Sequence, residues 1–404
     1  MPSKRGVMMW MLMAFFCFFQ FFMQLSGNLM ASGWQESFHL SESLTGFLSS
    51  SFFYGYIAVQ VPAGFLFDAC GMKKVIRLAV AVFVLGILLF AGAPSLTLGL
   101  LGRLMMGAGA GFAFVGMVYA TATWFSSSQF TLFVGLGEML SMALTALGQA
   151  VAPHFILEYG WRPTLFTLAG VGLVFALLIW SFLENPPEYK TKQLRIWPLF
   201  KLHAQTVIKV KNVWRTGLIA CGFFSVISVF ASLWGNQYLQ ARYHLDYVSA
   251  SHYIALIPLG FGLGCPILGL LNDRLISNRL LLQLSAFILF GLTLTMMGQG
   301  NSPIILSLCL FLMGTFGGGT VLSFYSAQKS ISPPFRGIAI GLCNTLVIAG
   351  AIIFQPLIGW IWPHYGLHAL WVFPILLLGC ALLTLPPFEC TGKLDLQGTD
   401  GLLR

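Results

Sequence analysis

Three carboxamide side chains recur at a spacing of four residues in the apolar stretch FFCFFQFFMQLSGN: Gln20, Gln24 and Asn28. On an α-helix this spacing puts all three side chains on one face. Carboxamides both donate and accept hydrogen bonds, and against lipid they would have no partner. The spacing therefore predicts that this face lines a cavity or a seam between helices, where it could bind a small polar solute.

A carboxylate lies on a second polar face, in GLGEMLSMALTALGQAVAP. Glu138, Ser141, Thr145 and Gln149 are spaced by three and four residues, so they share one face of a helix. A carboxyl group buried near the middle of a membrane is favoured in its neutral form, which makes Glu138 a candidate proton carrier. The alternative is a structural hydrogen bond from Glu138 to a neighbouring helix.

Arg103, in LGRLMMGAGAG, is the other charged residue expected inside an apolar helix. An Arg at the centre of a membrane helix costs about 2.5 to 3.5 kcal/mol on insertion scales, so it is expected to face a partner or a wet cavity. Because it lies near one end of its helix, its side chain could instead snorkel to the membrane surface.

Further polar residues in apolar stretches are candidates for a substrate path. They are Tyr54, Tyr119, Trp234, Asn236, Gln237, Tyr325, Asn344 and Gln355. Polar side chains in membranes also form hydrogen bonds between helices, so only part of this set is expected to touch a substrate.

Twelve apolar stretches must position these residues. One helical crossing needs about 20 mainly apolar residues, and 57% of the 404 residues are hydrophobic while 8% are charged. The expected spans are 8–31, 45–67, 75–93, 96–124, 128–155, 163–183, 213–239, 248–271, 279–299, 303–329, 335–362 and 367–386. The sequence therefore predicts an all-α membrane protein with twelve transmembrane helices.

Basic residues predict the orientation, because Lys and Arg are retained on the cytoplasmic side. With both termini cytoplasmic, all but three of the 21 Lys and Arg residues fall in cytoplasmic segments; the exceptions are Arg103, Arg162 and Arg242. The net charge of +9 is then a topological signal. Nucleic-acid binding is disfavoured because the basic residues are scattered instead of forming one patch.

A polar, basic segment divides the spans six and six. The expected divisions are a bundle over 1–184, a cytoplasmic linker over 185–212, a second bundle over 213–387 and a cytoplasmic tail over 388–404. Four residue pairs recur in order at offsets of 203 to 206: Asp68 with Asp273, Gly135 with Gly341, Pro153 with Pro356 and Gly160 with Gly366. A constant offset indicates an internal duplication, which is a transporter architecture.

The loop GFLFDACGMKK carries a resemblance to the major facilitator superfamily, whose signature reads G-x-L-x-D-x-x-G-x-[KR]-[KR]. The matching residues are Gly64, Leu66, Asp68, Gly71, Lys73 and Lys74, and a second copy keeps Gly269, Asp273 and Arg274. The Arg that the superfamily usually places two residues before the second Gly is absent, because Ala69 and Cys70 follow Asp68. The resemblance implies two pseudo-symmetric six-helix bundles, with these loop residues as a conformational gate.

Other motifs look like those of organic-anion and related solute symporters. They are the Gln60-x-Pro62-x-Gly64 pattern, TWF at 123–125 and GWR at 160–162. Arg103 before its Gly-rich run is similar to the fourth-helix pattern, which implies a role in proton coupling or substrate orientation. These symporters often place an Arg in the first helix, where this chain has Gln20 and Gln24, so zwitterionic or neutral polar solutes fit as well as anions.

The sequence thus predicts a secondary active transporter, not an enzyme, for an organic acid, amino acid or short peptide. Uptake is expected to be proton-coupled, in a bacterial-type inner membrane, by a monomer that needs no cofactor or metal. Proton-driven efflux is one alternative, although helix five ends in QAVAP without the Gly-Pro of superfamily antiporters. A transport-inactive membrane receptor is the alternative from another class.

Overall fold

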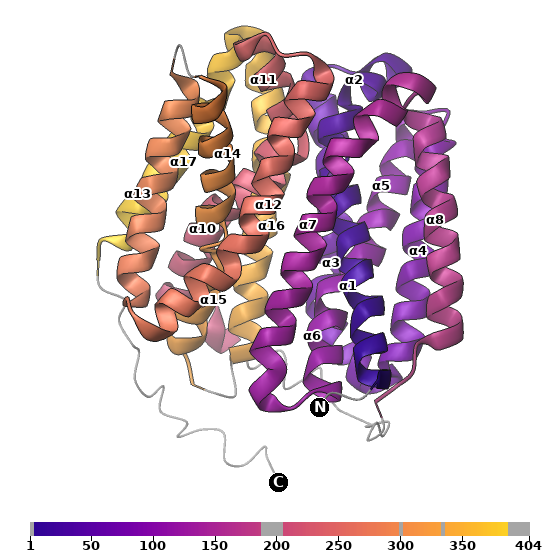
Figure 1. Ribbon diagram of the computed structural model, residues 1–404, viewed down its shortest axis with the longest axis vertical. Helices are drawn as coiled ribbons and strands as arrows, with labels where there is room; N and C mark the ends of the chain where they lie inside the picture. The colour runs from indigo at the N-terminus through magenta and orange to yellow at the C-terminus, as the bar shows by residue number, and fades with distance from the viewer. Residues whose placement is uncertain (1–3, 187–204, 299–301, 333–335, 387–404) are drawn as a thin grey trace.

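The computed structural model describes residues 4–186, 205–298, 302–332 and 336–386. Within these ranges the chain is almost entirely helical, and the long helices form two bundles (Figure 1). The predicted linker and tail lie mostly outside the described residues. The predicted all-α membrane fold with two helical bundles is confirmed.

The N-terminal bundle contains the first six membrane crossings. Its helices are α1 (Lys4–Leu25), α2 (Gly27–Phe38), α3 (Glu42–Cys70), α4 (Met72–Ala91), α5 (Leu96–Ala110), α6 (Ala113–Trp124), α7 (Ser127–Tyr159) and α8 (Trp161–Phe182). The first crossing is α1 followed by α2, and the fourth is α5 followed by α6.

The C-terminal bundle repeats this plan. Its helices are α10 (Lys211–Ser225), the π-helix η1 (Val226–Trp234), α11 (Gly235–Tyr243), α12 (Tyr247–Arg274), α13 (Asn278–Met297), α14 (Pro303–Gly317), α15 (Thr320–Lys329), α16 (Arg336–Tyr365), the 3-10 helix η3 (Gly366–Trp371) and α17 (Val372–Thr384). Ten helical stretches of the described chain are long and apolar enough to cross a membrane. The last of these, Ile338–Thr384, covers two predicted spans, and the 29-residue α3 is not among the ten.

Equivalent corners of the two bundles have the same backbone shape. His39 and His244, 205 residues apart, both end a helix in the left-handed conformation, with φ of 52° and 53°. Gly160 and Gly366, 206 apart, also have positive φ. Non-glycine residues rarely adopt such angles, so the recurrence at His39 and His244 indicates that the duplication extends to backbone conformation.

Glycines bring helices into backbone contact at matching places. A Cβ on Gly55 of α3 would lie 2.0 Å from a backbone oxygen of α5, and one on Gly260 of α12 would lie 2.1 Å from a backbone oxygen of α14. Gly107 and Gly314 are the reciprocal contacts. Small residues of this kind allow membrane helices to approach closely.

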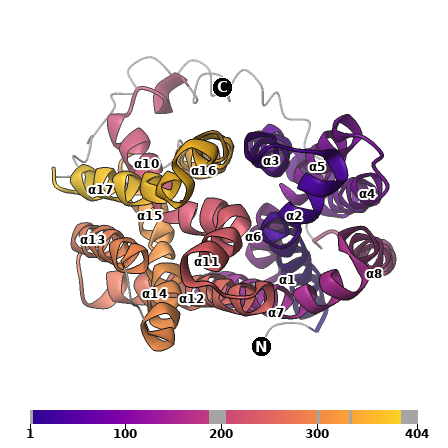
Figure 2. The same ribbon diagram turned by 90° about the horizontal axis from the view of Figure 1, so that it is seen from above.

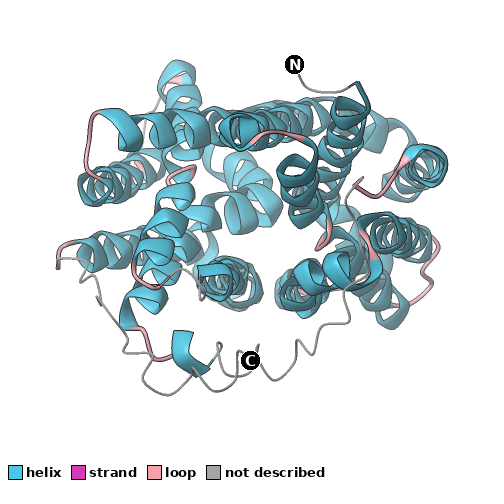
Figure 3. Cartoon of the chain, turned by 90° about the horizontal axis from the view of Figure 1, so that it is seen from below, coloured by secondary structure: helices cyan, strands magenta, loops and turns pink. Residues whose placement is uncertain are grey.

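The bundles meet along two seams, α3 beside α16 and α7 beside α12 (Figure 2). We call the side on which α1, α4 and α10 begin the basic face, and the other side the opposite face; Figure 3 shows the molecule from the end at which α1 begins. Near the opposite face, Gly46 of α3 packs on the backbone of Gln355, where a Cβ would lie 2.5 Å from its oxygen. Nearer the basic face, a Cβ on Gly135, Gly269 or Gly341 would meet nothing within 4 Å. The seams are therefore tight toward the opposite face and looser toward the basic face.

Candidate substrate and coupling site

The first membrane crossing is broken at Ser26, between α1 and α2. The predicted ladder of three carboxamides on one continuous helix is therefore wrong in one respect: Gln20 and Gln24 lie on α1, and Asn28 lies on α2. Gly27, directly after the break, allows close contact, because a Cβ there would lie 2.9 Å from Ser232 O of the other bundle. The break places the polar residues where the two bundles meet.

Arg103 of α5 holds this break in place. Its Nη1 donates to Met23 O at 3.2 Å and to Ser26 Oγ at 3.4 Å, and its Nη2 donates to Ser49 O of α3 at 3.0 Å. A break leaves backbone carbonyls without helical partners, and a guanidinium offers several donors in a fixed geometry. Arg103 therefore connects α5 to both α1 and α3.

Aromatic rings enclose the same guanidinium. Its Cζ lies 5.2 Å from the ring centroids of Trp34 and Phe52 and 5.9 Å from that of Phe90, within the range of cation–π attraction. Arg103 is 0% exposed, so it does not snorkel to the surface. The carboxylate of Glu138 is not among the acceptors described for Arg103.

Side chains of three further helices donate to backbone carbonyls beside the break. The hydrogen bonds are Gln149 Nε2 to Leu25 O at 3.2 Å, Ser232 Oγ to Gln24 O at 2.9 Å and Tyr247 Oη to Leu29 O at 2.7 Å. The last two cross from the C-terminal bundle, as does Asn236 N, which donates to Asn28 Oδ1 at 2.8 Å. These three inter-bundle hydrogen bonds lie toward the opposite face and hold the bundles together there.

Several buried polar atoms near the break have no hydrogen-bond partner among the residues that the structure describes. Gln20 has neither amide atom paired, and the set continues with Gln24 Nε2, Asn28 Nδ2, Gln149 Oε1 and Gln355 Oε1. A buried polar group without a partner costs about 1 to 3 kcal/mol, so each such group requires an explanation. A polar ligand or water between the bundles would satisfy this set, which we call the carboxamide cluster.

Glu138 lies on the α7 face that the sequence predicted. On this face Ser141 Oγ donates to Ala14 O of α1 at 3.0 Å, and Gln149 also reaches α1. Glu138 is partly exposed, and its Oε2 is buried without a partner. The next residue, Met139, packs against α12, where a Cβ on Gly262 would lie 3.3 Å from Met139 O. The acid therefore lies beside both bundles.

The C-terminal bundle contributes its own polar wall. Trp234 Nε1 donates to Gln355 O at 3.1 Å, and Gln355 Nε2 donates to Ser228 O at 2.7 Å. Asn236 Nδ2 donates to Ser251 Oγ at 2.6 Å. Three predicted residues, Trp234, Asn236 and Gln355, are thus buried and hydrogen-bonded across from α1 and α2, in two separate groups of contacts.

The other predicted substrate residues are half-buried or exposed. Tyr54 is 41% exposed and contacts Phe47, which is 40% exposed on the same face of α3. Tyr119 packs against Phe67, and the ring of Tyr325 lies 4.5 Å from Lys329 Nζ. The structure describes Gln237 and Asn344 as half-buried.

The predicted gating residues are described in part. Gly71 has a φ of 81° and joins α3 to α4, and the backbone N of Lys73 donates to Asn185 Oδ1 at 2.8 Å; Lys74 is exposed. Gly269 makes no close helix contact. The side chains of Asp68, Asp273 and Arg274, and the surroundings of Gly64, lie outside what the structure describes.

Sequence reasoning missed the residues that join the bundles, above all Ser26, Ser232 and Tyr247. The pair Ser26-Gly27 was a usable signal for a helix break. Tyr247 at the end of a span is typical of a membrane-interface aromatic, and nothing in its sequence context indicates a partner 218 residues away.

Two helical bundles with a buried polar cluster at their interface define a class, that of solute transporters built from repeats. Residues 10–346 match the Major Facilitator Superfamily, and the chain belongs to that family. The family consists of transporters and not of enzymes.

Individual relatives are distant. The chain is 24% identical over 339 residues to sodium-dependent phosphate transport protein 1, chloroplastic, of Arabidopsis thaliana, covering 79% of this chain and 66% of that protein. It is 23% identical to the probable sulfoacetate transporter SauU of Cupriavidus necator, covering 86% and 84%. Several other relatives are longer, and the chain spans 61% to 66% of the chloroplast anion transporters it matches.

Solved structures share the fold. A D-xylose-proton symporter superposes with a TM-score of 0.76 at 14% identity, covering 94% of this chain and 98% of the other. The inward open conformation of the xylose transporter XylE from E. coli superposes with a TM-score of 0.73 at 13% identity, covering 96% and 98%.

Proposed function

We propose that this protein is a secondary active transporter of a small polar organic solute, coupled to protons and working by alternating access. The observation that carries the proposal is the carboxamide cluster, a group of buried amides at the bundle interface that each have at least one atom without a partner. Polar residues inside a membrane protein are costly and mark substrate or ion paths. The basic face is assigned to the cytoplasm of a bacterial-type inner membrane, because basic residues are retained there.

The substrate is proposed to be an organic acid, an amino acid or a short peptide. Several relatives are described as transporters of anions, phosphate, ascorbate or sulfoacetate, which supports the anionic end of this range. Within this chain the buried guanidinium of Arg103 already bonds three protein groups, so we assign it a positioning role at the helix break. The carboxamides are then the groups left to bind the solute, through paired donors and acceptors.

Glu138 is proposed as the proton carrier. It is the acid on the interface face of α7, with an unpartnered oxygen and partial exposure. Protonation would remove its charge, and a neutral acid tolerates a closed, dry interface better than a carboxylate does. A proton taken up on one side could thus accompany the change of access to the other.

The inter-bundle hydrogen bonds place the described state closed toward the opposite face. Transport would require these bonds to break while the seams tighten at the basic face, where Gly135, Gly269 and Gly341 now have open space. In the proposed orientation this state faces the cytoplasm.

Reconstituted vesicles test the proposal. A thermal-shift screen of organic acids, amino acids and dipeptides would supply a ligand, and uptake of that ligand would then be measured with and without an imposed pH gradient. We expect gradient-driven accumulation by the native protein, and at least about a tenfold loss in Gln20→Leu and Gln24→Leu, because each removes a hydrogen bond of about 1.4 kcal/mol or more to the solute.

Gln283→Leu is the matched control, because this Gln donates to Thr384 O within the C-terminal bundle, away from the cluster. Uptake that is equally reduced in all three variants would reject the cluster as the binding site. A protein that neither binds nor accumulates any solute of the screen would contradict transport.

A further inference from the structure

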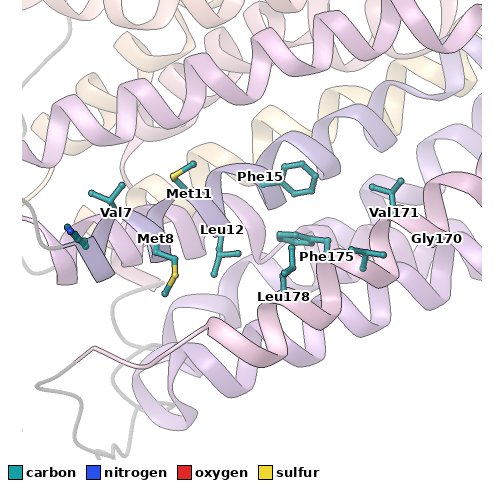
Figure 4. Close-up of a pocket in the computed structure, with 11 residues that line it drawn as sticks. Val7, Met8, Met11, Leu12, Phe15, Gly170, Val171, Phe175 and Leu178 are labelled. Carbon is teal, nitrogen blue, oxygen red and sulfur yellow. The ribbon is translucent and has the colours of Figure 1, made fainter.

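An apolar groove runs between α1 and α8 on the outer surface of the N-terminal bundle, away from the carboxamide cluster. It has a volume of about 800 Å³. Figure 4 draws its wall from α1, with Met8, Met11 and Phe15, and its wall from α8, with Phe175 and Leu178. The proposed transport function makes no use of this groove.

The groove is open to the surrounding medium. Met11 is 57% exposed and Val174 is 60% exposed, and both line the groove. Gly170 adds to the opening, because a Cβ there would meet nothing within 4 Å. Phe15 and Phe175, with ring centroids 4.8 Å apart, pack against each other between the two helices. The groove therefore has apolar walls and opens laterally toward the bilayer.

The length of the groove matches one leaflet. Along α1 its lining runs from Lys4 to Phe15, which is about 17 Å at 1.5 Å per residue. Half of a hydrocarbon core of about 30 Å is about 15 Å. A single acyl chain that enters from the basic face would therefore lie along the groove to the middle of the membrane. Met8 and Met11 are flexible side chains that adapt to such a chain.

A positive charge lies at one end of the groove. Among the described residues that line the groove, Lys4 is the one with a charge. It stands at the start of α1, where the helix dipole also favours an anion. Glu184 follows α8, and its backbone N donates to Met9 Sδ of α1 at 3.3 Å. It does not line the groove. The groove thus combines apolar walls one leaflet long with a cation at the level of the lipid headgroups.

We propose that this groove is a binding site for an anionic phospholipid of the leaflet at the basic face. One acyl chain lies between α1 and α8, and the headgroup phosphate pairs with Lys4. The site is independent of the substrate site, and the two proposals fail separately.

Native mass spectrometry of the full-length protein tests the site, with phosphatidylglycerol or phosphatidylethanolamine of the same acyl chains added to the detergent. We expect the native protein to retain one phosphatidylglycerol in preference to phosphatidylethanolamine by about fivefold, the factor that corresponds to about 1 kcal/mol per basic residue near an anionic headgroup. Lys4→Gln should remove this preference. Arg5→Gln is the control, because Arg5 follows Lys4 in the chain but does not line the groove. This variant loses the same charge and should keep the preference for phosphatidylglycerol.

A second pair of variants tests the walls. Gly170→Phe should fill the groove and reduce retained phosphatidylglycerol at least about fivefold. Gly291→Phe is the control, because this glycine is also exposed on a helix and its Cβ would also meet nothing within 4 Å. Equal lipid retention in these two variants, equal loss in Lys4→Gln and Arg5→Gln, or no preference for the anionic lipid would each overturn the proposal.

Discussion

The two bundles share a scaffold and differ in chemistry. Gly55 and Gly260 make the same backbone crossing, 205 residues apart, and the corner residues His39 and His244 have the same left-handed shape. Among the residues whose burial is described, however, the one fully buried charged side chain is Arg103, in the N-terminal bundle. The offset of 207 that relates Gly107 to Gly314 places the apolar Leu310 at the equivalent position. The duplication has therefore preserved helix packing, while the buried charge stands in one copy.

The same asymmetry holds for the proposed proton carrier. The offset of 206 that relates Gly135 to Gly341 pairs Glu138 with Asn344. A carboxyl group can change charge and an amide cannot. If transport is coupled to protons, the N-terminal bundle is expected to bind the proton. The C-terminal bundle is then expected to contribute only hydrogen bonds to the solute.

The largest effect on stability is expected from Arg103→Leu. This substitution gives the N-terminal bundle the residue that the C-terminal bundle has at the equivalent position, Leu310. The variant loses hydrogen bonds to Met23 O, Ser26 Oγ and Ser49 O, and bonds to charged groups are worth about 1.5 to 3 kcal/mol each. Thermal unfolding in detergent should show a loss of several degrees. Leu310→Met, which conserves volume, is the control in the other bundle. An Arg103→Leu protein with native stability would show that the charge does not hold the break.

Glu138→Gln should separate coupling from binding. Because the amide cannot take up a proton, we expect accumulation driven by a pH gradient to fall at least about tenfold, a loss of about 1.4 kcal/mol of driving force. Exchange of labelled for unlabelled solute across the vesicle membrane should continue. Asn344→Ala should instead weaken solute affinity and leave the dependence on the gradient unchanged. Normal accumulation by Glu138→Gln would remove this residue from the coupling mechanism.

Because the two bundles share this helix crossing, Gly55→Ala and Gly260→Ala are expected to cause equal losses of stability. An added Cβ would lie 2.0 and 2.1 Å from a backbone oxygen, and overpacking of this kind typically costs about 1 to 3 kcal/mol. Unfolding midpoints of the two variants should fall by similar amounts. Gly379→Ala, where a Cβ meets nothing within 4 Å, should leave the midpoint unchanged. A large loss in one variant alone would mean that the crossings are not equivalent.

The smallest effect is expected at the inter-bundle hydrogen bonds. Ser232→Ala and Tyr247→Phe each remove one bond to a carbonyl beside the Ser26 break, worth about 0.5 to 1.5 kcal/mol. This should shift the population about two- to tenfold toward opening at the opposite face, seen as faster deuterium uptake in α2 and α11. Thr293→Val removes a buried hydroxyl that bonds only within its own helix, to Leu289 O, and should not change this uptake. Unchanged exchange in both test variants would indicate that other contacts close this face.

Most of the fold could be predicted from the sequence, because each apolar stretch of about 20 residues has few alternatives to a membrane helix. The breaks were harder to predict. The spans 8–31 and 303–329 were expected to be continuous, and the structure interrupts them at Ser26 and after Gly317. Such breaks depend on donors from other helices that compensate the freed carbonyls, and those donors are distant in the chain.

The site was predictable to the extent that one helix determines it. The spacing of Glu138, Ser141, Thr145 and Gln149 identified a face of α7, and the contacts of Ser141 and Gln149 with α1 agree with it. Tyr54 shows the limit, because a polar residue in an apolar helix can face the lipid or the other helices. No local pattern distinguishes the two orientations without knowing which helices are neighbours.

The sequence by itself determined the helical membrane fold, its duplication and the residue types that can exchange hydrogen bonds or a proton, because these follow from composition and local spacing. The tertiary structure decided that Arg103 donates hydrogen bonds at the helix break and that carbonyls beside Ser26 accept hydrogen bonds from the other bundle. It also decided that both amide atoms of Gln20 and Nε2 of Gln24 have no described partner. These facts depend on contacts between residues 54 to 218 positions apart, which only the packing of the two bundles can specify.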